Sequence, residues 1–172
     1  MTRLARFEAR VLPYLDAAYN LARWLTRNDH DAQDVVQEAA LRAYRFFDGL
    51  RGEPRPWLLA VVRNACWSWL QANRPADIEP LDDEIADDAL PGPEAALARS
   101  LDRRLLNEAI AALPVQFREA LVLRELEDLS YRDIARVAGI PIGTVMSRLA
   151  RARRLLADSL RVVAAPRLRV HK

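Results

Sequence analysis

The stretch from Ser130 to Leu160 reads SYRDIARVAGIPIGTVMSRLARARRLLADSL and decides the fold of the C-terminal part of the chain. Ser130 is suited to cap a helix, because its hydroxyl can accept a hydrogen bond from a free backbone N–H, and Asp133 follows three residues later. Gly139 suits the left-handed residue that ends this helix, and Pro141 suits the first turn of the next. The stretch therefore predicts two short helices joined by a tight turn, a helix-turn-helix.

The second helix of this pair has two contrasting faces. Its apolar residues recur at i, i+4 and i+7 and can pack on the apolar residues of the first helix. These residues are Val145, Leu149 and Ala152 on the second helix and Ile134, Ala135 and Ala138 on the first. The opposite face is polar and basic, and such side chains can reach phosphates and base edges of DNA. It carries Thr144, Ser147, Arg148 and Arg151. A helical hairpin with a solvated basic face is the alternative, but ten basic and only two acidic residues follow Ser130, which favours DNA binding.

An acidic, proline-rich segment separates this element from the first part of the chain. Residues 75–95 read PADIEPLDDEIADDALPGPEA, with four prolines, eight acids and no base. Prolines interrupt helices and like charges extend a chain, so we expect a flexible linker. It would join an N-terminal domain, residues 1–74, to a C-terminal domain, residues 96–165, that is followed by a basic tail, residues 166–172. The overall net charge of +2 hides this segregation, since residues 96–172 carry fifteen bases against eight acids, the footprint of a protein that meets phosphate.

Both domains are predicted to be helical, because apolar residues recur at spacings of three and four and alternating strand-like runs are absent. We therefore expect an all-α fold. In the N-terminal domain one apolar stripe is formed by Phe7, Val11, Leu15, Ala18 and Leu21, a second helix begins near Asp31, and a third runs from about Pro56 to about Ala72. In the C-terminal domain helices are expected over about 97–113 and 117–126, before the helix-turn-helix.

Several classes of protein are disfavoured by composition. The single cysteine, Cys66, cannot form an internal disulfide and has no partner cysteines for a zinc site. The longest uncharged apolar run, Pro56 to Val62, is far shorter than the ~20 residues that cross a bilayer, so a cytoplasmic protein is expected. There are two histidines and no glycine-rich phosphate loop or nucleophile motif, so an enzyme is not expected.

Three motifs resemble the extracytoplasmic-function (group IV) sigma factors of bacterial RNA polymerase. Residues 113–153, with LSYRDIA and GIPIGTV followed by SRLARAR, resemble their minus-thirty-five-reading domain. DAQDVVQEAALRAYRFF, from Asp31, resembles the helix that docks on the clamp helices of the polymerase. RGEPRPWLLAVVRNACWSWL, from Arg51, resembles the element that opens and reads the minus-ten sequence. The motifs occur in family order, and together they cover most of the chain.

This resemblance implies a role for each of three sets of residues. Contacts to minus-thirty-five DNA are expected from Arg132, Arg136, Thr144, Ser147, Arg148, Arg151 and Arg154. Contacts to the minus-ten element are expected from Arg63, Asn64, Trp67 and Ser68, with Asn64 in a pocket for a flipped base because an amide offers both a donor and an acceptor. Polymerase binding is expected from Asp31, Asp34, Gln37 and Glu38, of which the last three share one helix face. Trp57 is expected in the core, whereas for Trp67 and Trp69 stacking on bases and helical packing both stay open.

The implied partners are core RNA polymerase, through its clamp helices and flap, promoter DNA and an anti-sigma factor. No cofactor, metal or small-molecule substrate is expected; His30, Asp34 and Glu38 could be read as metal ligands, but a working site needs more converging groups. Two features depart from the family pattern: few basic residues follow Asn64, and Met146 stands where relatives often carry a basic residue. A free-standing helix-turn-helix regulator is the alternative function, although it does not explain DAQDVVQEA, from Asp31, or the element from Arg51 to Leu70.

Overall fold

The computed structural model of the chain describes residues 1–78 and 103–168. The predicted acidic linker falls mostly between these ranges, outside the described residues. Every helix or strand assigned in the two ranges is a helix, which confirms the all-α prediction. The N-terminal domain contains α1 (Arg3–Val11), η1 (Leu12–Tyr14), α2 (Leu15–Thr26), α3 (Asp29–Phe46), η2 (Phe47–Gly49), α4 (Pro54–Asn73) and η3 (Pro75–Asp77). The C-terminal domain contains α6 (Arg103–Ala111), α7 (Val115–Leu121), the π-helical turn η4 (Val122–Leu126), α8 (Tyr131–Ala138) and α9 (Ile142–Leu168).

The N-terminal domain is built on three helices, α2, α3 and α4, that each pack against the other two. Their buried faces are lined by alanine, leucine and valine, which let the helices approach closely. The stripe predicted for one helix is split between two, because Pro13 lies in the short 3-10 turn that separates α1 from α2. Helix α1 still contributes to the core: the ring of Phe7 meets Tyr44 and Phe47 edge to face, at 5.2 and 5.4 Å between centroids.

The C-terminal domain is organised around α7, all seven of whose residues are buried. Helix α9 covers α7 on one side, and α2 of the N-terminal domain contacts it as well. Helix α9 has 27 residues and is longer than the short helix predicted, since no proline interrupts it between Pro141 and Pro166 and apolar residues continue along it to Leu160. It continues to Leu168, past the place where the sequence suggested that the domain gives way to a tail.

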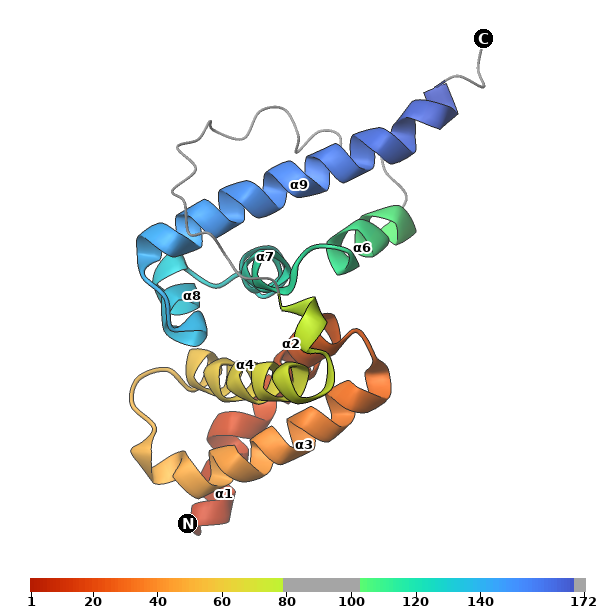
Figure 1. Cartoon of the computed structure of the whole chain (residues 1–172). Helices are drawn as coiled ribbons and strands as arrows, with labels where there is room; N and C mark the ends of the chain where they lie inside the picture. Colours follow the sequence, from red (N-terminus) through yellow and green to blue (C-terminus); the bar gives the residue numbers. More distant parts are fainter. Residues whose placement is uncertain (79–102, 169–172) are drawn as a thin grey trace.

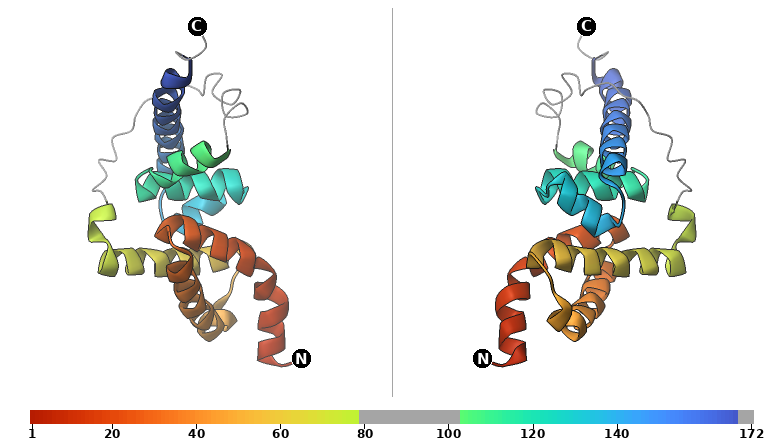
Figure 2. Two further views of the ribbon diagram at one scale, coloured as in Figure 1. Left: turned by 90° about the vertical axis from the view of Figure 1, so that its right-hand side faces the viewer. Right: turned by 90° about the vertical axis from the view of Figure 1, so that its left-hand side faces the viewer.

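The two domains are packed against each other. Figure 1 shows α9 with α6, α7 and α8 on one side of the molecule, and α1 and α3 on the other, with α2 and α4 between these two groups. The two side views in Figure 2 show the same arrangement. Helix α4 packs on α8, and α2 packs on α7. The sequence predicted two domains but gave no indication of this contact, which places two of the four minus-ten candidates, Arg63 and Trp67, against the C-terminal domain.

In the two described ranges, no helix is both long enough and apolar enough to span a membrane.

Candidate nucleic-acid and polymerase interfaces

The helix-turn-helix has the local geometry that its sequence predicts. The Ser130 hydroxyl accepts a hydrogen bond from the backbone N–H of Asp133 at 3.1 Å, so it caps α8. Gly139 ends α8 in the left-handed region, at φ 66°, where a residue with a Cβ is strained. Val145 and Leu149 of α9 are buried, as is Ile134 of α8. These contacts fix the orientation of α9 and hence of its outer face.

Most of the residues expected at minus-thirty-five DNA lie on the surface. Four arginines are exposed: Arg132, Arg136, Arg151 and Arg154. The other three candidates, Thr144, Ser147 and Arg148, are half-buried. The hydroxyl of Ser147 donates a hydrogen bond to the backbone carbonyl of Thr144 at 3.0 Å, and the Arg151 guanidinium lies 5.3 Å from the centre of the Phe117 ring. Met146, the departure from the family pattern, is 52% exposed at the start of α9.

The minus-ten candidates on α4 are divided between solvent and the domain contact. Asn64 and Ser68 are exposed. Arg63 and Trp67 instead face the C-terminal domain, where both donate to the buried carboxylate of Glu119. The distances are 2.5 Å from Arg63 Nε and 3.0 Å from Trp67 Nε1 to the same oxygen of Glu119. The Arg63 side chain is 16% exposed and that of Glu119 only 1%.

The other two tryptophans of this element also pack on the hydrophobic core, and both are half-buried. For Trp57 this agrees with the expected core position. The Trp69 ring in addition has the guanidinium of Arg74 at 5.0 Å from its centre.

A second buried acid of the C-terminal domain repeats this pattern. Glu127 accepts hydrogen bonds from the side chain of Asn20 on α2 at 2.8 Å and from Arg55 on α4 at 3.2 Å. Arg55 also donates to the backbone carbonyl of Glu127. Sequence reasoning missed Glu119 and Glu127 altogether. For Glu119 a signal was present, since it is a charged residue inside a run of otherwise mostly apolar residues, and such a charge needs a partner if it is buried.

The polymerase-binding candidates lie on α3. Asp34, Gln37 and Glu38 are exposed, and they occupy one face of the helix as their spacing predicted. Asp31 is half-buried and differs from the others: its carboxylate is 3.3 Å from Arg74, and its backbone N–H is capped by the side chain of Asn28. This ion pair ties α3 to the end of α4.

The suspected metal ligands do not form a site. His30 and Asp34 are 3.6 Å apart as an exposed i, i+4 pair, while Glu38 pairs with Arg42 at 3.3 Å. Across residues 1–78 and 103–168 no group of three or more His, Cys, Asp or Glu side chains is placed to hold a metal ion.

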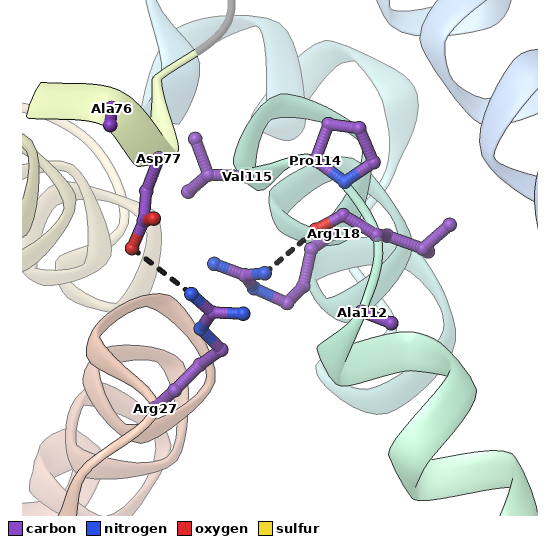
Figure 3. Close-up of a pocket in the computed structure, with 8 residues that line it drawn as sticks. Arg27, Ala76, Asp77, Ala112, Pro114, Val115 and Arg118 are labelled. Carbon is purple, nitrogen blue, oxygen red and sulfur yellow. Dashed lines mark hydrogen bonds and ion pairs between the residues drawn. The ribbon is translucent and has the colours of Figure 1, made fainter. Parts of the chain in front are cut away.

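Arg118 of α7 links the two domains through hydrogen bonds to backbone carbonyls (Figure 3). Its guanidinium donates to the backbone carbonyls of Leu113 at 2.7 Å and Ala111 at 3.0 Å, and to that of Leu25 in the other domain at 3.3 Å. Burial, followed by the nearby charge of Arg27, lowers the pKa of Arg118 to about 10, so the group stays charged at neutral pH. A small pocket of about 170 Å³ lies here, and Figure 3 shows Arg27 and Arg118 entering it from opposite sides.

Cys66 is buried on α4 beside the Glu119 contact. Burial and then the charge of Glu119 raise the pKa of its thiol to about 12, opposed in part by Arg63. A thiol in this state is neutral at neutral pH, and its burial makes it slow to react.

Comparison with known proteins accounts for both domains. The family model for sigma-70 region 2 matches residues 11–75, and that for sigma-70 region 4 matches residues 103–156. The ECF RNA polymerase sigma-E factor of Haemophilus influenzae is 36% identical over 155 residues, which is 81% of this chain and 79% of that protein. The chain belongs to the extracytoplasmic-function sigma factors. The RNA polymerase sigma-H factor of Pseudomonas aeruginosa is also 36% identical, over 90% of this chain and 86% of its own length.

Two solved structures with a similar fold are informative. The sigma factor RpoE of Bartonella quintana, solved in complex with the anti-sigma factor NepR, superposes with a TM-score of 0.70 and 28% identity over 91% of this chain and 98% of its own. CnrH, solved with the cytosolic domain of CnrY, is 23% identical and has the same fold, with a TM-score of 0.63 over 92% of this chain and 87% of its own. This sigma factor thus directs core RNA polymerase to promoters and initiates transcription there.

Proposed function

We propose that this sigma factor has three separate binding surfaces, one for core polymerase, one for the minus-ten strand and one for minus-thirty-five DNA. The exposed face of α3, with Asp34, Gln37 and Glu38, binds the clamp helices of core polymerase, and Asp31 supports it from the end of the helix. The α4 residues Arg63, Asn64, Trp67 and Ser68 bind the opened minus-ten strand. The exposed arginines of α8 and α9, with Thr144, Ser147 and Arg148, bind minus-thirty-five DNA. The C-terminal domain also contacts the polymerase flap.

The placement of the residues supports this division. Acidic and amide side chains face outward from α3, where they can meet basic groups of a partner, and arginines face outward from the helix-turn-helix, where they can meet phosphates. Opposite charges on separate faces fit a protein that binds another protein and DNA at the same time. The match of region 2 over residues 11–75 disfavours the alternative of a free-standing regulator, which needs no such domain.

The remaining features of the proposal come from the family. We infer that the protein acts in the cytoplasm, where RNA polymerase works, that it is not an enzyme, and that it needs no cofactor. An anti-sigma factor is proposed as its regulator, since the sigma factor RpoE of Bartonella quintana, whose structure is similar, was solved in complex with the anti-sigma factor NepR.

Asn64 provides the test that separates strand capture from docking on duplex DNA. Asn64→Ala should leave association with core polymerase and binding to minus-thirty-five duplex unchanged, because Asn64 belongs to neither surface. Transcription from a linear promoter should fall, since the lost hydrogen bonds to a flipped base cost about 1–3 kcal/mol. A template already mismatched across the minus-ten element should recover part of the activity, because the cost of unpairing has been removed.

Asn73→Ala is the matched control, because Asn73 ends the same helix and its amide donates to the backbone carbonyl of Trp69 at 2.9 Å. Run-off transcription and permanganate footprinting measure both templates in one assay. Normal transcription by Asn64→Ala on the linear promoter would show that the base pocket is formed by other residues.

A further inference from the structure

The C-terminal domain covers the side of α4 that carries Arg63 and Trp67. The carboxylate of Glu119 accepts hydrogen bonds from Arg63 Nε at 2.5 Å, from a second Arg63 nitrogen at 3.4 Å and from Trp67 Nε1 at 3.0 Å. The Arg63 guanidinium also stacks on the Trp67 ring, 4.6 Å from its centre. A cation and an aromatic ring of the proposed strand-binding surface are therefore both held by one buried acid.

A carboxylate in this position resembles a nucleic-acid phosphate. The arginine fork binds carboxylate and phosphate oxygens with the same two-point geometry. Stacking on tryptophan is likewise how single-stranded bases are bound. The second pair follows the same rule, because Arg55 of α4 is bound by the buried Glu127, whose side chain is only 8% exposed. Each acid comes from the C-terminal domain and each arginine from α4.

We propose that the free chain has a closed state in which Glu119 occupies the place of a minus-ten strand phosphate at Arg63 and Trp67, so that the chain must open before it can bind that strand. This inference rests on the proposed minus-ten role of α4. Glu127 closes the same interface at the start of α4 by holding Arg55.

The closed state covers Arg63 and Trp67 of the proposed strand-binding surface, while Asn64 and Ser68 stay exposed, and it leaves much of the other two surfaces exposed. Asp34, Gln37 and Glu38 on α3 are exposed while Glu119 is in place. The four outer arginines of the helix-turn-helix are exposed as well. Docking on core polymerase through α3 therefore does not require opening, whereas strand capture does. Closure would keep the free protein from binding single strands before it reaches the polymerase.

The decisive variant is Glu119→Gln in the full chain. Glutamine has the shape of glutamate but no charge, so the closed state would hold Arg63 nearly buried without a counterion, while the open state returns Arg63 to water. Glu125→Gln is the matched control. Glu125 lies in the same domain and its loss changes the net charge equally, but it is exposed and pairs with Arg153 of its own domain at 2.9 Å.

Two measurements separate opening from strand binding. The first is the rate at which the single cysteine, Cys66, reacts with a small aromatic disulfide reagent in the native protein. Cys66 lies between Arg63 and Trp67 in the sequence, and the charges of Arg63 and Glu119 both act on it, so we expect the contact to shield it. The second is the affinity for a fluorescein-labelled 20-nucleotide single strand of mixed sequence, by anisotropy.

Glu119→Gln should raise both the labelling rate and the strand affinity about tenfold, since each scales with the open fraction. Glu125→Gln should leave both as in the unaltered chain. Adding Glu127→Gln to Glu119→Gln should raise both further.

Each other outcome is also decisive. Equal labelling rates in Glu119→Gln and Glu125→Gln would overturn the closed state, and so would a gain in strand affinity shared by both variants, which reports net charge alone. Faster labelling without a gain in strand affinity would leave the closed state standing and overturn the minus-ten role of α4.

Discussion

Replacing Arg118 by methionine removes a buried guanidinium while keeping a long side chain in its place. Arg118 is 2% exposed, and its nitrogens are bonded to three backbone carbonyls, those of Leu25, Ala111 and Leu113. The bonds to Leu25 and Leu113 are buried, so water cannot replace the lost donor there. A buried acceptor left without a donor costs about 1–3 kcal/mol, and two of them predict a loss of about 2–6 kcal/mol in the free energy of unfolding.

Urea denaturation followed by circular dichroism measures this loss. Arg27→Met is the control, because Arg27 reaches the same Ala111 carbonyl at 3.3 Å but is an exposed residue, and its ion pair with Asp77 at 3.0 Å is partly open to solvent. Its loss should cost under about 1 kcal/mol. Similar unfolding midpoints for the two variants would refute the argument that Arg118 holds α7 through its buried carbonyl bonds.

Three further predictions concern other parts of the chain. Asp34→Arg combined with Glu38→Arg should abolish association with core polymerase in gel filtration, with helicity unchanged by circular dichroism, because both side chains are more than 60% exposed and the reversal repels a basic partner. Arg151→Ala should weaken binding to minus-thirty-five duplex by about 1–3 kcal/mol if it reads a base, and should reduce the log–log salt slope by about 0.9 if it neutralises a phosphate; unchanged binding would remove Arg151 from the interface. Burial raises the pKa of the Cys66 thiol in the folded chain to about 12, above its ordinary value of 9.0, so the unfolded chain releases the thiol proton first and stability should fall as pH rises above 9. Cys66→Ala should lack this component of the pH slope in urea titrations at pH 9 to 11, and equal slopes would show that the thiol ionises equally in both states.

The sequence predicted local structure well where local rules control it. Ser130 caps α8 because its hydroxyl satisfies a free backbone N–H three residues away, and Gly139 ends α8 because a residue without a Cβ adopts the left-handed conformation easily. Both requirements arise within a few residues of the sequence. The exposed face of α3 likewise follows from its 3.6-residue period. The break between α1 and α2 was missed although Pro13 marks it, because the apolar spacing continues through the break.

The contact between the domains could not be predicted in this way. Glu119 lies 56 residues from Arg63 and 52 from Trp67, and Glu127 lies 107 residues from Asn20. No periodicity or motif relates positions so far apart. A charged residue within an apolar helix indicates that a partner is needed, but it does not say which of the chain's many arginines supplies it.

The nature of these contacts bears on whether the interface can separate. An interface that stays closed is stabilised most by apolar packing, and a buried ion pair adds little to its stability because each charge has lost its water. The same ion pair suits an interface that opens, since both charged side chains are well hydrated once they are apart. Glu119 with Arg63 and Glu127 with Arg55 place such pairs at two points along α4. In the proposed closed state, opening would release arginines whose charge a nucleic-acid strand can neutralise, so the groups that hold the chain closed would also be available to bind the strand.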